Sequence, residues 1–228
     1  MIDENTKKDL GTEHGMLPAI FLDFHGTTSN FTFWQSLDSE KHRKIQEKVF
    51  EANAPLIKPW MRGQIKWQSV VLDISALSGV PVEALVCEAG NKSVPLMEPE
   101  MESAVESLRT CTRVFLVSDN MDLLTERFFD ENLDAAFDDV WFSCQHGELK
   151  NEPNATAYEM LAKKHNVDLS RSVLFDDSWS SIRTFTRLGG TGIKVQGPED
   201  TLEYLGMRNV GFVQTPQENE SPQQLLRA

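Results

Sequence analysis

Three apolar runs of this 228-residue sequence each end at a side chain that could do chemistry. These polar positions are Asp23, Ser118 and the pair Asp176-Asp177. A fourth candidate, Lys150, stands in a Gly-Glu-Leu-Lys turn that we expect just before a helix. A carboxylate after a strand is often only a turn former or a helix cap, so each position taken alone is weak evidence.

Each residue type suits one part of phosphoryl transfer. A carboxylate such as Asp23 can attack phosphorus and form an acyl-phosphate. A serine between a strand and a helix, as at Ser118, can bind phosphate oxygens together with backbone N–H groups. Two adjacent aspartates near the nucleophile make an oxygen-only site that suits Mg²⁺. A lysine such as Lys150 can offset the negative charge of nucleophile and substrate.

The elements that must position these residues read as alternating strands and helices. Short apolar runs predict buried parallel strands at 16–22, 113–117, 140–143, 172–175 and 191–195. Helical patterns occupy 98–109, 121–133, 155–165 and 178–188. This alternation predicts an α/β fold, a three-layer Rossmann-like parallel sheet with helices on both faces. Because ligands bind beyond the carboxyl ends of such strands, the polar positions should converge there.

One long segment interrupts the alternation. Residues 30–96 contain charged helical stretches at 40–51 and 66–78 and no convincing strand. We expect them to form a small helical cap inserted into a catalytic core made of 16–29 and 97–214. Trp60 and Arg62, inside this insertion, are candidates for contacts with a substrate. Residues 1–15 and 215–228 are polar, and we expect both to be flexible.

Composition narrows the classes of partner. The net charge of −13 makes binding to the phosphate backbone of a nucleic acid unfavourable, although a cleft can still hold a small anion. Three scattered cysteines favour a reducing compartment over a disulfide framework. With no signal-peptide pattern in 1–15 and no run of about 20 apolar residues, we expect a cytoplasmic protein without membrane contact.

Taken in order, the four polar segments resemble the motifs of the haloacid dehalogenase (HAD) superfamily, in its helical-cap, phosphoglycolate phosphatase-like branch. Asp23-Phe24-His25-Gly26-Thr27 resembles the first motif, DxDGT, and Val117-Ser118-Asp119-Asn120 the second. Residues 147–153 are similar to the third, G-x-x-K-P-x-P, and 174–178 to the fourth. The likeness spans 16–197, and the order of all four motifs around a cap-sized insertion makes it specific.

The resemblance implies a Mg²⁺-dependent phosphatase that acts on a small phosphorylated metabolite through an aspartyl-phosphate. Asp23 would be both the nucleophile and a metal ligand, and the backbone carbonyl of His25 would be a second ligand. Asp176 would complete the metal site, with Asp177 as a further ligand or in support.

The resemblance also implies a set of groups for the phosphoryl oxygens. These groups are Thr27, Ser118, Asp119 and Lys150. Lys150 would in addition stabilise the carboxylate of Asp23, and it therefore counts among the catalytic residues with Asp23 and His25.

His25 departs from the pattern, because phosphatases of this family normally carry an aspartate there as the general acid and base. A histidine, with an ordinary pKa of about 6.5, can do the same work near neutral pH. A second hypothesis is a changed chemistry, dehalogenase-like or phosphonatase-like. The third is a protein that binds a phosphorylated ligand or partner and turns it over poorly.

Overall fold

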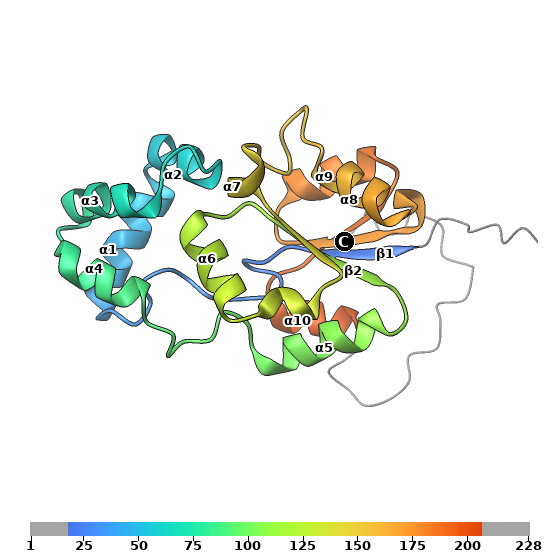
Figure 1. Cartoon of the computed structure of the whole chain (residues 1–228), viewed down its shortest axis with the longest axis horizontal. Coiled ribbons are helices and arrows are strands. Elements are labelled where there is room, and N and C mark those ends of the chain that lie inside the picture. Colours follow the sequence, from blue (N-terminus) through green and yellow to red (C-terminus); the bar gives the residue numbers. More distant parts are fainter. Residues whose placement is uncertain (1–17, 207–228) are drawn as a thin grey trace, which may run out of the picture.

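The computed structural model describes residues 18–206, and its centre is a five-stranded parallel sheet (Figure 1). The strands are ordered β3-β2-β1-β4-β5. They comprise β1 (Ala19–Leu22), β2 (Arg113–Ser118), β3 (Asp139–Phe142), β4 (Val173–Asp176) and β5 (Thr191–Lys194). The predicted α/β class and parallel sheet are confirmed, with β1 in the middle.

The strand boundaries differ from the predicted ones by at most one residue where the structure describes them. β1 begins at Ala19, directly after Pro18, which has no N–H to give to a neighbouring strand. Residues 16–17, which we expected in this strand, lie outside the described residues. β3 ends at Phe142, because Ser143 already begins a short helix, α7 (Ser143–His146).

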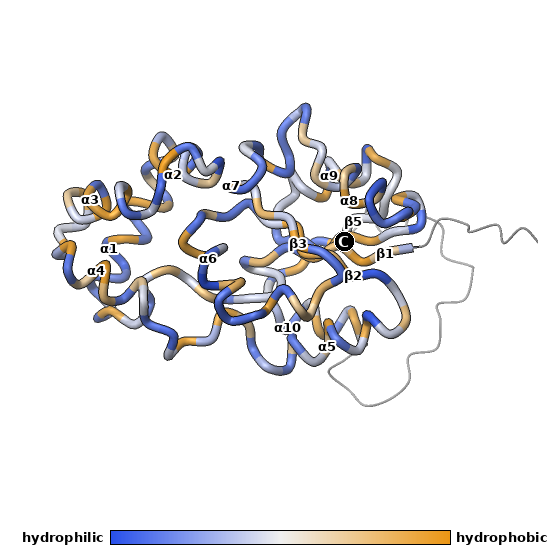
Figure 2. Tube along the Cα trace, viewed as in Figure 1, coloured by the Kyte–Doolittle hydropathy of each residue, from blue (hydrophilic) through white to orange (hydrophobic). Residues whose placement is uncertain are grey.

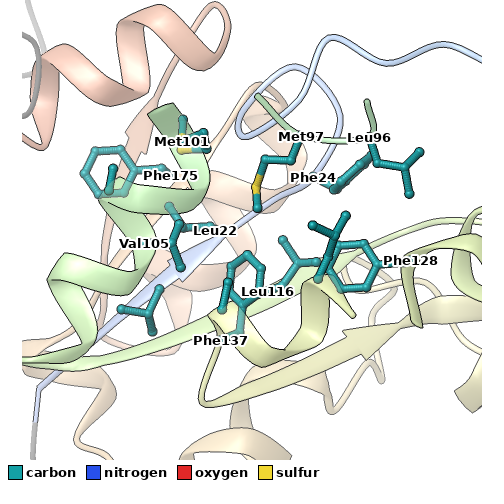
Figure 3. Close-up of a cluster of buried hydrophobic side chains, with 14 of the residues drawn as sticks. Leu22, Phe24, Leu96, Met97, Met101, Val105, Leu116, Phe128, Phe137 and Phe175 are labelled. Carbon is teal, nitrogen blue, oxygen red and sulfur yellow. The ribbon is translucent and has the colours of Figure 1, made fainter. Parts of the chain in front are cut away.

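Alternate side chains of the strands enter two separate hydrophobic clusters, one on each face of the sheet. Leu22, Leu116 and Phe175 face the cluster drawn in Figure 3, together with Met101 and Val105. The latter two come from α5 (Pro99–Arg109); α6 (Asp122–Asp130) and α10 (Pro198–Tyr204) also contribute to this face. Every second side chain of these strands thus packs against the helices that form the first outer layer.

The other face carries the second cluster. Phe21, Phe115 and Leu174 are fully buried there. They pack against α8 (Ala157–His165) and α9 (Trp179–Arg187), which lie across the sheet from α5 and α10 in Figure 1. The three predicted layers are thus observed. The helices run shorter than expected; α6, for example, ends at Asp130 because Asn132 turns the chain with a left-handed φ of 58°.

Residues 30–96 contain helices only, with no strand, as predicted. They comprise α1 (Ser39–Ile45), a π-helix (Gln46–Glu51), α2 (Ala54–Met61), α3 (Trp67–Ser78) and α4 (Val82–Ala89). Sequence patterns missed α2 and α4. The group lies to one side of the sheet in Figure 1 and has its own hydrophobic cluster, which includes Trp34, Trp60 and Ile74. We call residues 30–96 the helical insertion below.

The helical insertion is fixed to the sheet region through the start of α6. The carboxylate of Asp122 accepts hydrogen bonds from Trp60 Nε1 (2.7 Å) and Trp67 N (3.3 Å). Met121 and Leu123 also pack into the hydrophobic cluster of the insertion, and Leu96 packs into the cluster of the sheet. Side chains from each side of the expected boundary between cap and core therefore pack into the hydrophobic cluster of the other side. The division into cap and core remains a prediction.

Hydropathy along the chain follows these layers: the sheet strands are largely apolar, and polar residues recur on the outer helices (Figure 2). Within residues 18–206, no helix combines the length and the apolar character needed to cross a membrane.

A partly exposed ion pair ties the outer strand β3 to the end of α8. Asp139 Oδ2 lies 2.7 Å from both Lys164 Nζ and His165 Nε2, and Asp139 Oδ1 accepts the N–H of Val140. Burial by itself would raise the pKa of Asp139, but the hydrogen bonds from Lys164 and His165 outweigh it and hold this pKa below its ordinary value. A carboxyl with a lowered pKa stabilises the fold in its ionised form.

We therefore expect Asp139→Asn to lower the free energy of unfolding at pH 7 by about 1 kcal/mol. The stabilisation is present above the pKa of the unfolded carboxyl and is lost as the pH falls through the lower folded pKa. The difference between variant and wild type should shrink once the pH drops below 3.8. Urea unfolding from pH 7 to 3.5 measures it, with Glu106→Gln on the exposed side of α5 as control. A difference that stays constant to pH 3.5 would contradict this reasoning.

Candidate active site

The pairing of the two central strands sets Asp23 beside Asp176. Leu22 of β1 pairs with Phe175 of β4, and the next residue along the chain is in each case one of these aspartates. The backbone N–H of Asp23 donates to the carbonyl of Phe175 over 3.1 Å, so the pairing continues one residue past β1. Both carboxylates are almost completely buried. The expected convergence of strand ends is therefore observed for this pair.

Lys150 joins the two carboxylates. Its Nζ lies 2.7 Å from Asp23 Oδ1 and 2.7 Å from Asp176 Oδ2, and it also donates to the carbonyl of Val117 over 3.2 Å. The contact with Asp23 is an ion pair without hydrogen-bond alignment, whereas the contact with Asp176 is a hydrogen bond. Side chains from β1, β4 and the 147–153 loop thus meet at one buried ammonium group.

Burial and charge act in opposite directions on this group. Burial alone would lower the pKa of Lys150, but the nearby carboxylates of Asp176 and Asp23 outweigh it and hold this pKa well above its ordinary value. For Asp176, burial raises the pKa, although Lys150 opposes the effect. Lys150 therefore stays charged, and its positive charge offsets the repulsion between the two neighbouring carboxylates.

A loop rather than a helix terminus holds Lys150 in place. We expected Lys150 just before a helix, but α8 begins only at Ala157, so this expectation was wrong. The backbone N–H of Lys150 instead donates to Asp119 Oδ1 over 2.7 Å. Burial raises the pKa of Asp119 to about 6, against the opposing charge of Lys150. The side chain of Asp119 fixes the loop, so any contact of Asp119 with phosphate falls to its backbone N–H.

Three carboxylates lie close enough together to share one divalent cation. One oxygen each from Asp23, Asp176 and Asp177 lies within 4.8 Å of the others, with Asp177 exposed. The turn after β1 approaches closely: a Cβ on Gly26, which has a φ of 70°, would lie 2.7 Å from Asp177 Oδ2. An oxygen-only donor set beside a bare backbone turn fits Mg²⁺. The carbonyl of His25 immediately precedes Gly26 and remains the predicted fourth ligand.

Two threonine hydroxyls near Asp23 differ in their hydrogen bonding. Thr28 Oγ1 donates to the carbonyl of Asp23 (2.9 Å) and so stabilises the turn after β1. The Oγ1 of Thr27 is buried and has no hydrogen-bond partner in the structure. Ser118 ends β2, which pairs with β1, and is also buried. A buried hydroxyl without a partner is costly unless a ligand supplies one, as a phosphoryl oxygen would for Thr27.

One supporting residue escaped the sequence analysis. Ser143 Oγ accepts the backbone N–H of Asn120 (2.8 Å) and donates to the carbonyl of Met61 (2.7 Å). It therefore connects the second motif to the helical insertion. A single serine after a strand gives no distinctive signal, and only the pairing of β2 with β3 reveals its place.

His25 is exposed, and it lines a cavity of about 270 Å³ between the strand ends and the helical insertion. Asp119 and Asn120 of the second motif line the same cavity. A group at this position can exchange a proton with a molecule in the cavity, so the position suits a general acid and base.

Trp60 and Arg62 are placed differently from our expectation of substrate contacts. Trp60 is fully buried among the helices of the insertion and donates to Asp122. Arg62 forms an ion pair with Glu152 of the 147–153 loop. Neither side chain lines the cavity beside His25. Both connect the insertion to the sheet region instead.

Sequence comparison finds no match to this chain among protein-family models or curated proteins. Solved structures do match it. A predicted HAD-like family hydrolase from Porphyromonas gingivalis has a TM-score of 0.64 at 20% identity, covering 86% of this chain and 100% of that one.

Two further structures extend the comparison. A HAD family enzyme from Bacteroides thetaiotaomicron has a TM-score of 0.65 at 15% identity and covers 83% of this chain and 98% of that one. L-2-haloacid dehalogenase from Xanthobacter autotrophicus, with chloropropionic acid covalently bound, has a TM-score of 0.54 at 12% identity, over 79% and 78%. The resemblance of the four sequence motifs thus agrees with the similarity of the three-dimensional folds. The chain has the fold of the HAD-like hydrolases.

Proposed function

We propose that this protein is a Mg²⁺-dependent phosphomonoester hydrolase that works through an aspartyl-phosphate on Asp23. The observation that carries the proposal is the buried cluster in which Lys150 Nζ lies 2.7 Å from the carboxylates of Asp23 and Asp176. A carboxylate held beside a permanent cation and next to two more aspartates is suited to attack an electrophile that carries negative charge.

Neighbouring structures support both the metal and the phosphate. The Bacteroides thetaiotaomicron enzyme has been crystallised with magnesium and inorganic phosphate. The fold also serves L-2-haloacid dehalogenase, so fold alone does not choose the chemistry. The choice rests on Asp177: Asp176 already pairs with Lys150, but a third carboxylate beside Asp23 and Asp176 makes an oxygen-only group that suits a metal ion.

In the first half of the reaction the carboxylate of Asp23 attacks phosphorus. The bond from phosphorus to the leaving-group oxygen breaks as the new bond to Asp23 forms. The leaving oxygen takes a proton from His25, which lines the cavity where the leaving group would lie. Thr27, Ser118 and Lys150 bind the oxygens of the phosphoryl group and hold it in line.

In the second half water replaces the alcohol. His25, now neutral, takes a proton from the water molecule, whose oxygen attacks phosphorus and releases inorganic phosphate from Asp23. Asp23, Asp176, Asp177 and the carbonyl of His25 would hold Mg²⁺, which neutralises charge on the phosphoryl group when it is bound.

We expect Asp23→Asn to remove all measurable release of phosphate from an aryl phosphate with Mg²⁺, because an amide is a poor nucleophile. The wild type should lose its activity with a chelator and regain it with excess Mg²⁺. Asp73→Asn, on the exposed side of α3, is the matched control and should keep full activity. Substantial turnover by Asp23→Asn, with unfolding unchanged, would rule out the covalent mechanism. Mg²⁺ binding without turnover of a phosphometabolite panel by the wild type would favour a ligand-binding protein.

The second prediction concerns the histidine in place of the usual aspartate. His25→Ala should slow turnover by roughly 10²–10⁴-fold, the usual contribution of a general acid and base. His25→Asp, which restores a group able to carry a proton, should recover most of this loss. Steady-state rates and rapid mixing, which separate formation of the aspartyl-phosphate from its hydrolysis, provide the measurement. Equal rates for wild type and His25→Ala would mean that position 25 supplies only its backbone carbonyl.

A further inference from the structure

The cavity beside His25 has walls of a particular chemistry. Half-buried aromatic rings of Phe31, Phe33 and Phe50 line it, with the aliphatic side chains of Ile57 and Met61. The rings of Phe33 and Phe50 are parallel within 5°, with centroids 6.0 Å apart. Rings left partly open to a cavity offer apolar surface that a ligand can cover.

Two polar side chains of the wall, Thr32 and Gln46, are already paired within the protein. Thr32 Oγ1 donates to Gln35 Oε1 (3.1 Å) and lies 3.1 Å from His42 Nε2. Gln46 Nε2 lies 3.2 Å from the same His42 nitrogen and donates to the carbonyl of Phe33 (3.3 Å). These two groups do not need a hydrogen bond from a ligand, so this part of the wall does not select for a polyhydroxylated one.

Among the described residues, none gives the cavity wall a permanent positive charge for a second anionic group. No lysine or arginine side chain within residues 18–206 lines the cavity. The guanidinium of Arg127 stacks over the Phe31 ring at 5.1 Å and pairs with Glu131, while Arg62 pairs with Glu152. A distal carboxylate or phosphate would therefore be buried without a partner of opposite charge.

We infer that the cavity binds the leaving group of the substrate, and that this group is uncharged, apolar and about the size of one substituted aromatic ring. The inference rests on the proposed function and names its substrate class: a monoester of phosphate with an apolar alcohol or phenol. The size follows from the volume, since a cavity of about 150 Å³ holds benzene and this one has about 270 Å³.

Two substrates that differ only at the far end test the inference. Benzyl phosphate and 4-carboxybenzyl phosphate share the reacting phosphorus, the leaving oxygen and the attached CH₂ group. We expect kcat/KM for benzyl phosphate to exceed that for the carboxylated substrate by at least about tenfold, because the carboxylate would enter an apolar wall without a counter-charge. Methyl phosphate, which leaves the wall uncovered, should fall below benzyl phosphate by about 10²-fold.

A charge placed in the wall should reverse the preference. Met61→Lys introduces an ammonium group on a side chain of similar shape, and it should make 4-carboxybenzyl phosphate the better substrate. Met160→Lys, on the far side of α8 and away from the cavity, makes the same change of charge and should keep the wild-type preference.

The possible outcomes separate this inference from the proposed function. Equal or better use of 4-carboxybenzyl phosphate by the wild type, or a preference for phosphocholine over benzyl phosphate, would overturn the apolar assignment and leave a phosphatase. Without hydrolysis of any ester, calorimetry with benzylphosphonate and 4-carboxybenzylphosphonate plus Mg²⁺ still tests the cavity. Tighter binding of benzylphosphonate than of 4-carboxybenzylphosphonate would support the apolar assignment of the cavity and contradict the proposed phosphatase activity. Equal binding of the two phosphonates would contradict both proposals.

Discussion

The site depends on one buried ammonium group between two buried carboxylates. Lys150 Nζ lies 2.7 Å from Asp23 and from Asp176, which stand side by side at the ends of paired strands. Removing one member of such a cluster leaves an uncompensated buried charge, which typically costs about 3–5 kcal/mol. The cluster therefore constrains β1, β4 and the loop that carries Lys150 to keep their relative positions.

The parallel sheet holds the ends of β1 and β4 next to each other, as this cluster requires. Because its strands run in one direction, all their carboxyl ends reach the same edge, where β1 lies between β2 and β4. Side chains alternate between two hydrophobic clusters, so the strands are held from both faces and their ends are free to carry polar groups. Aromatic side chains of the helical insertion and residues that follow β1 and β2 together line a cavity of about 270 Å³.

The sequence predicted well those features that depend on local patterns. Apolar runs ending in Asp23, Ser118 and Asp176 identified three strands and the polar residues at their ends, because buried parallel strands are apolar on both faces. It failed where distant segments decide the structure. The loop around Lys150 takes its shape from Asp119, 31 residues earlier, and not from a following helix. The cavity wall combines the stretch around Phe33 with the π-helix that carries Phe50, and no spacing in the sequence connects them.

The most direct test of the central cluster is the stability of Lys150→Met with and without Mg²⁺. Denaturant unfolding in the absence of metal should show a loss of about 3–5 kcal/mol relative to wild type, because two carboxylates are left facing each other. Saturating Mg²⁺ should stabilise this variant more than it stabilises the wild type, since the ion replaces the missing positive charge. Lys163→Met, on the exposed side of α8, provides the control for the loss of a charge. An unchanged free energy of unfolding for Lys150→Met without metal would contradict the account.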